Sequence, residues 1–480
     1  MKPIVNKIGY GLGDMSSSMF WKIFSYYLPI FYSDVFGLSL GSTAMLMLVT
    51  RVWDTVSDPM MGIIADRTQT RWGKYRPYLL WFALPFAVSG VLLFTTPDLS
   101  ETGRLVWAYA TYILMMTVYT GINVPYGSML GVMTDNSDEK TVFSSYRMFF
   151  AYAGSFIALY SWEPLCRFFS EQSGDGGVTE ISALAVQQAG WQHAMMVVGS
   201  GCFLLFVGCF LLTREKVKLT GTASLLGDFK SLLRNSPWWL LSCGAVCTNL
   251  FFTVRGATVA YYFKYYIGDG ASISLGPVSF LFFAGLFLAV GEVCNMVGVV
   301  IAVPVSQHFG KKPTFISVGI LLALLSVLFF YLPLTGTGFL LMLLLQVLIS
   351  VCTGIVSPLV WSMYADVADY SLARNGTAST GLIFSSGSMA QKFGGAIAGS
   401  AVLWLFDAFG LVPNAARQSD TAILGMKLAM SYIPAAIAAL MVIIMVLYPL
   451  NREHMHHIAH KLKEMEQEVK DKLHPSPKTQ

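Results

Sequence analysis

Charged side chains are scarce in this chain of 480 residues. Asp, Glu, Lys and Arg together make up only 12% of it, whereas a soluble globular protein carries about 25%. So few charges cannot cover a water-facing surface, and 55% of the residues are hydrophobic. The composition therefore excludes a soluble enzyme and predicts a membrane protein whose outer surface faces lipid.

Paired cysteines and a focused positive patch are also missing. The seven Cys residues include no C-x-x-C spacing, which argues against a zinc site or a disulfide framework. The net charge of +4 is spread along the loops, so no nucleic-acid partner is expected. The His-rich stretch 453–460 lacks an H-E-x-x-H motif, and we interpret it as a polar tail. Neither a cofactor nor a metal site is predicted.

Long apolar stretches, in contrast, are abundant. The hydrocarbon core of a bilayer is about 30 Å thick and requires roughly 20 mainly apolar residues per helix. Twelve stretches of this kind lie at 15–36, 40–65, 77–97, 104–130, 147–169, 190–213, 237–266, 277–304, 313–333, 337–365, 380–406 and 423–449. The sequence therefore predicts an all-α membrane protein with twelve transmembrane helices.

Lys and Arg are distributed unevenly between the connections. They gather after the second, fourth, sixth, eighth and tenth apolar stretches, and the intervening connections hold few of them. Because basic loops remain in the cytoplasm, we expect both termini there, which agrees with an even number of spans. The predicted location is the bacterial inner membrane.

A weak repeat at half the chain length suggests a duplicated unit. GKYRP at 73–77 follows the second apolar stretch, and GKKP at 310–313 follows the eighth. Two parallel six-helix halves are typical of the major facilitator type of transporter. The predicted units are an N-terminal bundle at 1–213, a cytoplasmic linker at 214–236, a C-terminal bundle at 237–449 and a cytoplasmic tail at 450–480.

The second apolar stretch contains three ionisable residues, Arg51, Asp54 and Asp58. Their spacing places all three on one helical face, with Ser57 beside them. Charged groups inside a membrane are unfavourable unless they are paired or functional, and two neighbouring carboxylates favour binding of a proton or a cation. The alternative is a structural ion pair between Arg51 and one of the aspartates.

Arg147 and Lys392 are the most informative charges elsewhere. Lys392 lies in the middle of an apolar stretch, too far from its ends to reach water easily. It could line a transport path, or it could be a packing cation satisfied by Asp54 or Asp58. Four further charges in apolar stretches could equally be interfacial anchors: Lys22, Glu163, Arg255 and Glu292.

The fourth apolar stretch carries a polar and aromatic group formed by Tyr119, Asn123, Pro125 and Tyr126. Amide and hydroxyl groups suit a neutral hydroxylated ligand, and Pro125 frees backbone carbonyls toward a cavity. The rings of Trp21, Tyr26, Tyr119 and Tyr126 could stack on a sugar, although aromatic residues in membrane helices more often serve in packing.

Motifs along nearly the whole chain resemble those of the glycoside-pentoside-hexuronide:cation symporters, the group of the bacterial melibiose carrier. In chain order they are YGLGD at 10–14, FYSDVFG at 31–37, RVWDTVSDP at 51–59, RWGKYRP at 71–77, NVPYG at 123–127, WSMYADVADY at 361–370 and QKFG at 391–394. The resemblance implies that Asp54 and Asp58 form the cation site with Ser57 and Thr120 as neighbouring oxygen ligands, and that Arg51 helps to gate.

The resemblance also implies a sugar site. The candidate substrate-binding residues are Ser17, Ser18, Tyr119, Asn123, Tyr126, Arg147 and Lys392. Departures from the melibiose carrier concern this site: Ser17 and Ser18 replace a sugar-binding Lys and Asp, and Asn123 and Gly127 replace an acid and a Trp. At the cation site Ser57 replaces an Asn. Because Ser reaches less far than Asn, a proton is favoured over sodium as the coupling ion.

We therefore predict a symporter that carries a glycoside, pentoside or hexuronide with a proton or a sodium ion. Its expected partners are the sugar and the lipid bilayer, and it is expected to act as a monomer. An amphiphile such as a lysolipid is an alternative cargo, implied by eukaryotic relatives of the same group. A membrane enzyme or a non-transporting sensor is a poorer alternative, because no catalytic set of residues falls in facing spans.

Overall fold

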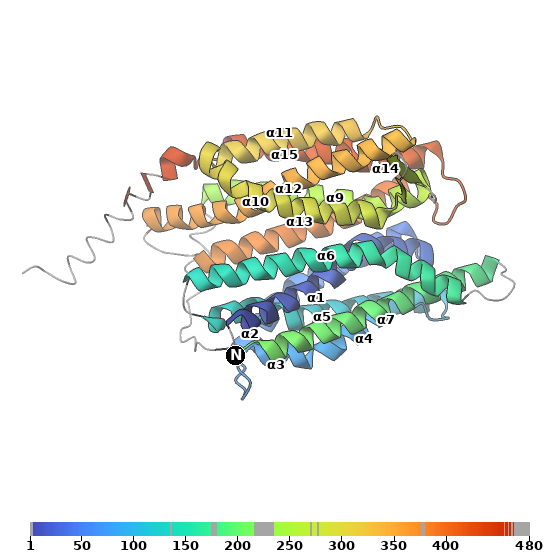
Figure 1. Cartoon of the computed structure of the whole chain (residues 1–480), viewed down its shortest axis with the longest axis horizontal. Coiled ribbons are helices and arrows are strands. Elements are labelled where there is room, and N and C mark those ends of the chain that lie inside the picture. The colour runs from blue at the N-terminus through green and yellow to red at the C-terminus, as the bar shows by residue number, and fades with distance from the viewer. Residues whose placement is uncertain are drawn as a thin grey trace, which may run out of the picture.

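The computed structural model describes residues 3–134, 137–173, 180–215, 235–268, 271–275, 278–375, 380–455, 457–458, 460–461 and 464. The first group of helices comprises α1 (Pro3–Ile30), α2 (Leu40–Arg67), α3 (Arg76–Trp81), α4 (Ala83–Leu93), α5 (Glu101–Met133), α6 (Ser137–Ser173) and α7 (Glu180–Leu212). The second comprises α9 (Ser236–Tyr262), α10 (Ala284–Phe309), α11 (Lys311–Phe329), α12 (Gly336–Asn375), α13 (Thr380–Ala408), α14 (Asp420–Met430) and α15 (Tyr432–Leu447). Figure 1 shows the two groups as parallel layers of long helices.

Within the described residues the helices make twelve passes, because two of the passes are broken. The predicted third span consists of α3 and α4, which are interrupted at Phe82, and the twelfth consists of α14 and α15, interrupted at Ser431. The predicted eighth span begins too early. Residues Val278–Leu281 form strand β2, which pairs with β1 (Ser272–Leu275) in an antiparallel hairpin. Of the predicted linker 214–236, residues 216–234 lie outside the described residues.

Seven of these passes are long and apolar enough to cross a membrane by length and composition alone. The helices α1, α2, α6 and α13 are not among them, and α3 and α4 are individually short. Most of the charged residues predicted above lie in these four long helices, whereas Arg255 lies in α9 and Glu292 in α10. Their charges are tolerated where they face the protein interior.

Close packing inside the second layer depends on two glycines. A Cβ atom on Gly298 of α10 would lie 2.2 Å from the carbonyl oxygen of Val351, and a Cβ atom on Gly354 of α12 would lie 2.2 Å from that of Asn295. Only residues without a side chain permit this approach, which is typical of helix contacts in membranes. The contact fixes Asn295 and its neighbours against α12.

At the end distant from the N-terminus, hydrogen bonds and ion pairs join the two layers. The π-helical turn η1 (Phe31–Val35) continues α1, and the turn η2 (Phe263–Ile267) continues α9. Asp34 of η1 is only 1% exposed and lies 2.5 Å from Nζ of Lys264 in η2. It also accepts a hydrogen bond from Tyr265, and its backbone oxygen accepts one from Asn414. These contacts close the far end of the interface between the layers.

A second contact at this end involves Glu163 of α6. Its Oε1 accepts hydrogen bonds from the hydroxyl of Tyr27, at 2.9 Å, and from the backbone N–H of Gly285, at 3.2 Å. Gly285 lies in the first turn of α10, where unpaired N–H groups favour a negative charge. Glu163 therefore joins the two layers at this end.

Candidate functional site

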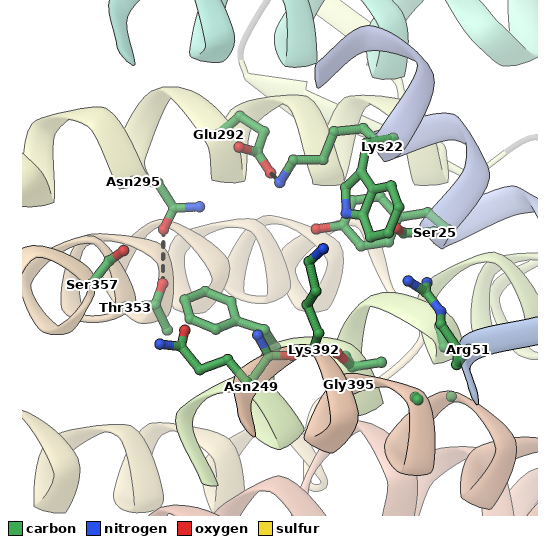
Figure 2. Close-up of a pocket in the computed structure, with 18 of the residues that line it drawn as sticks. Lys22, Ser25, Arg51, Asn249, Glu292, Asn295, Thr353, Ser357, Lys392 and Gly395 are labelled. Carbon is green, nitrogen blue, oxygen red and sulfur yellow. Dashed lines mark hydrogen bonds and ion pairs between the residues drawn. The ribbon is translucent and has the colours of Figure 1, made fainter. Parts of the chain in front are cut away.

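A cavity of about 500 Å³ lies between the two layers. Its walls come from α1, α2, α5 and α6 of the first layer and from α9, α10, α12 and α13 of the second. Figure 2 shows its polar side chains converging from both sides, among them Lys22, Arg51, Asn249, Glu292 and Lys392. The volume is in the range of roughly 300–1,000 Å³ that is usual for small-molecule sites.

The predicted cation-binding residues lie together beside this cavity. Thr120 of α5 stands between the two carboxylates of α2, with its Oγ1 3.3 Å from Oδ1 of Asp54 and 2.9 Å from Oδ1 of Asp58. Ser57 Oγ lies 3.3 Å from Thr120 Oγ1 and donates to the backbone oxygen of Asp54. Asp54 is 3% exposed and also lines the cavity. The four side chains form one cluster of oxygen atoms, which is a set of ligands suited to a proton or a hard cation.

Lys392 connects this cluster to the cavity. Its Nζ forms an ion pair with Asp58, and its side chain lines the cavity from α13. This geometry matches the predicted alternative in which Lys392 is satisfied by one of the aspartates. Arg51 takes a different position, with its guanidinium 4.7 Å from the ring centroid of Trp21 and 5.5 Å from that of Phe24. The cation that pairs with Asp58 is therefore Lys392, from the opposite layer, and not Arg51.

The aromatic wall of the cavity is only partly the one expected. Tyr119 and Trp21 both line it, and their ring centroids are 5.0 Å apart. Asn123 is not among the lining residues. Its side-chain amide donates to the backbone oxygen of Tyr119 in the preceding turn of the same helix.

Further predicted substrate-binding residues lie outside the lining of this cavity: Ser17, Ser18, Tyr126 and Arg147. Arg147 pairs with Asp14 of α1, with Nε 3.1 Å from Oδ2, and lies over the ring of Tyr126. The Tyr126 hydroxyl donates to the backbone oxygen of Tyr10 at 2.6 Å, and Ser17 donates to its own helix at Gly13. In this conformation Arg147 and Lys392 therefore belong to separate clusters, since Asp14 holds the guanidinium.

The structure contains an ion pair between Lys22 and Glu292 that the sequence did not predict. Lys22 of α1 and Glu292 of α10 point toward one another across the cavity, with Nζ 2.5 Å from Oε1 (Figure 2). They are 270 residues apart in the chain, so spacing gives no sign of the contact. Glu292 is 4% exposed. The interfacial alternative is therefore wrong for both residues.

Uncharged polar side chains on the second layer were also missed. Thr353 donates to Oδ1 of Asn295 at 2.8 Å, and the amide nitrogen of Asn295 is turned toward the space near Lys22 (Figure 2). Asn249 and Gln391 line the same cavity. Nε2 of Gln391 is buried, and no hydrogen-bond partner is found for it among the described residues. An amide in the middle of a predicted apolar stretch was the signal that could have identified these residues.

Arg255 belongs to the structure of the second layer and not to the cavity. Its guanidinium donates to the backbone oxygen of Met430 at 2.7 Å and to Oε1 of Gln346 at 2.9 Å. Met430 ends α14 at the break before α15, where a carbonyl loses its helical partner. Arg255 satisfies this carbonyl, so the interfacial interpretation is wrong here as well.

Comparison with known proteins gives consistent matches over almost the entire chain. The family model described as "MFS/sugar transport protein" matches residues 9–452. The putative glycoside/cation symporter YagG of Escherichia coli is 35% identical, over 95% of this chain and 94% of that protein. The isoprimeverose transporter of Lactiplantibacillus pentosus is 32% identical over 88% and 83% of the two chains. The glucuronide carrier protein homolog of E. coli is 28% identical over 92% of each.

Solved structures match the fold. The crystal structure of tetrameric PepTSo2 superimposes with a TM-score of 0.69, covering 95% of this chain and all of that one at 12% sequence identity. At this low identity the match concerns the arrangement of the helices alone.

Proposed function

The chain belongs to the MFS/sugar transport family, within its glycoside/cation symporters, and from this premise we propose that the central cavity binds the sugar while Asp54, Ser57, Asp58 and Thr120 bind the coupling cation. The predicted fold, an all-α membrane protein with two six-helix bundles, is confirmed. So is the predicted function of cation-coupled sugar symport, and the protein is a transporter rather than an enzyme.

One observation carries the residue assignment: Lys392 contacts the cation cluster and the sugar cavity at once. When a cation or proton occupies Asp58, the attraction between this carboxylate and Lys392 weakens. Lys392 then becomes available to the hydroxyl groups of a sugar in the cavity. By linkage, a sugar that engages Lys392 favours cation binding to Asp58 by the same factor.

A proton fits the cluster better than sodium. The Ser57 hydroxyl donates to the backbone oxygen of Asp54, so its position is fixed by its own helix. Thr120 is already shared between the two carboxylates. A proton needs only one carboxylate oxygen, whereas a sodium ion would have to draw several of these oxygen atoms around itself.

The coupling would be strong enough for concentrative uptake. One cation moving down 100 mV gains about 2.3 kcal/mol, and a tenfold concentration gradient adds about 1.4 kcal/mol. With one cation per sugar, this sum sustains an accumulation on the order of several-hundred-fold, provided that neither ligand alone permits the cavity to change sides.

The protein is a multi-pass membrane protein, and we place it in the inner membrane with both termini in the cytoplasm. The N-terminus and the last described residues lie at the same end of the layers (Figure 1), as the basic loops predict. The contacts of Asp34 and Glu163 at the opposite end support a conformation in which the cavity faces the cytoplasm. We propose the monomer as the transporting unit.

The lysolipid alternative is less consistent with the cavity. Its lining includes Lys22, Arg51, Asp54, Glu292 and Lys392, which would have to lie against an acyl chain. An acyl chain would displace water from these groups, and removing even paired charges from water is unfavourable.

Sugar-evoked cation flux tests the proposal. The purified protein is reconstituted in liposomes without a membrane potential, and a panel of glycosides is added while pH and sodium are varied independently. We expect at least one glycoside to evoke alkalinisation of the outer medium. Uptake of no glycoside under any condition would contradict the proposed function, and stimulation by sodium alone would contradict the choice of the proton.

A further inference from the structure

We propose that the Lys22–Glu292 pair restricts the cavity to uncharged glycosides and excludes sugars that carry a carboxylate or sulfonate group. This inference rests on the proposed function and names the substrate class of the same site. The relatives include an isoprimeverose transporter and a glucuronide carrier protein homolog, so membership of the family alone does not decide between uncharged and anionic sugars.

The position of the pair is the first argument. Lys22 projects from α1 and Glu292 from α10, and their charged atoms are 2.5 Å apart inside the cavity (Figure 2). Glu292 is 4% exposed, and its contact with Lys22 provides its compensating charge. A sugar carboxylate that took Lys22 would leave Glu292 buried without this partner and would place two negative charges side by side. Removing one partner from a buried ion pair is strongly unfavourable.

The charge balance of the whole site is the second argument. Among the described residues, the basic groups at the cavity wall are Lys22, Arg51 and Lys392, and the acidic ones are Asp54 and Glu292. Asp58 adds a third carboxylate through its ion pair with Lys392. Before the coupling cation binds, three positive and three negative groups leave no net charge to attract an anion, and two of the three cations have a carboxylate partner.

The third cation is also a poor anion site. The Arg51 guanidinium packs against the rings of Trp21 and Phe24. Asp54 lies on the same face of α2, three residues further on and almost completely buried. An incoming carboxylate would therefore meet this aspartate beside the guanidinium, and repulsion between the two negative groups would weaken its binding.

The remaining polar groups suit hydroxyl ligands. Asn249, Asn295 and Gln391 present amides, and Thr353 and Ser357 present hydroxyl groups, all on the second layer. The buried Nε2 of Gln391 lacks a partner among the described residues and needs an acceptor. On the opposite side, the aromatic side chains of Trp21 and Tyr26 line the cavity. Neutral donors and acceptors facing aromatic rings are appropriate for a sugar with free hydroxyl groups.

A matched pair of probes isolates the charge. Methyl glucoside and methyl glucuronide differ only in that a CH₂OH group is replaced by a carboxylate. Each is used as a competitor against uptake of a radiolabelled neutral glycoside that the protein transports, and the ratio of the two inhibition constants is recorded. This ratio is independent of expression level. For the wild type we expect the glucoside to compete at least about tenfold better than the glucuronide.

Glu292→Gln frees Lys22 while nearly preserving the size of the side chain. We expect this variant to shift the ratio toward the glucuronide by about tenfold or more. The double variant Lys22→Gln/Glu292→Gln removes the freed cation, and its ratio is expected to return toward that of the wild type. Asp366→Asn is the matched control, because it breaks the ion pair with Lys311, which lies outside the cavity lining, and should leave the ratio unchanged.

The outcomes separate the two proposals. If the glucuronide competes in the wild-type protein as well as the glucoside does, the inference is contradicted while sugar symport stands. This outcome does not depend on whether the variants fold. An active Glu292→Gln protein with an unchanged ratio also contradicts the inference. If neither sugar competes and no glycoside is transported, the proposed function fails as well.

Discussion

Lys392 of α13 forms an ion pair with Asp58 of α2 and so joins the two helix layers at the point where the oxygen cluster meets the central cavity. The pair is accessible, since the Lys392 side chain is 41% exposed. An ion pair in such surroundings can be exchanged for other partners without stranding a charge in an apolar environment. This property is required of a contact that forms and breaks in each transport cycle.

Asp58→Asn removes the carboxylate that pairs with Lys392. We expect uphill accumulation of sugar to be lost, because the coupling cation no longer binds with its normal affinity. Exchange of internal for external sugar should persist, since exchange requires no net return of the cation. Accumulation and exchange are measured in the same membrane vesicles, with Glu101→Gln, at an exposed position in α5, as the control. Undiminished accumulation would refute the assignment of Asp58.

Lys392→Gln leaves both aspartates in place but removes the Lys392 ammonium group, which competes with the coupling cation for Asp58. Half-maximal stimulation of uptake should then require a lower concentration of the coupling cation. Sugar affinity should fall, because the cavity loses a charged donor, and a hydrogen bond to a charged group contributes about 1.5–3 kcal/mol. Initial uptake rates over a grid of sugar and cation concentrations give both constants. If Lys392 were only a packing residue, both would stay constant while the amount of folded protein decreased.

Asp34→Asn weakens the contact that closes the far end. Truncating one partner of a buried pair is unfavourable by about 3–5 kcal/mol, and the effect here is expected to be smaller because the Lys264 side chain is one-third exposed. The conformations should shift toward one open at this end. Spin labels at Thr102 of α5 and Thr421 of α14, exposed positions on the two layers, should show a longer distance in the variant. An unchanged distance distribution would contradict the role of Asp34.

Gly354→Ala tests the packing that fixes the second layer. The added Cβ would lie 2.2 Å from the backbone oxygen of Asn295, which a rigid backbone cannot accommodate. Overpacking of this kind is destabilising by about 1–3 kcal/mol or more. The thermal midpoint in detergent should therefore fall. Gly201→Ala is the matched control, because nothing lies within 4 Å of its added Cβ, and its midpoint should not change. Equal midpoints for the two variants would contradict the packing argument.

The sequence could predict the acidic face of α2 because periodicity within one helix is a local property. Asp54, Ser57 and Asp58 share a face as expected, and the resemblance correctly brought Thr120 of a different helix beside them. The twelve passes could also be predicted from the sequence, because the thickness of the bilayer sets the minimum length of each apolar stretch.

Contacts between residues far apart in the sequence could not be predicted from helical periodicity or from the lengths of the apolar stretches. Lys22 and Glu292 are far apart in the chain and each looks like a possible interfacial residue by itself. Arg147 was expected at the central cavity, but Asp14 pairs with it elsewhere. Both cases follow from the same cause: the partner of a charge is chosen by the packing of helices, and composition gives the number of charges without giving their pairs.

Equilibrium binding of the sugar at two concentrations of the coupling cation tests the central claim most directly. With purified wild-type protein, raising the cation should tighten sugar binding by a factor of about 5–150, the usual range for coupled sites. In Asp58→Asn the dependence should disappear. A sugar affinity in the wild type that is the same at both cation concentrations would show that the oxygen cluster and the cavity are not coupled through Lys392 and Asp58.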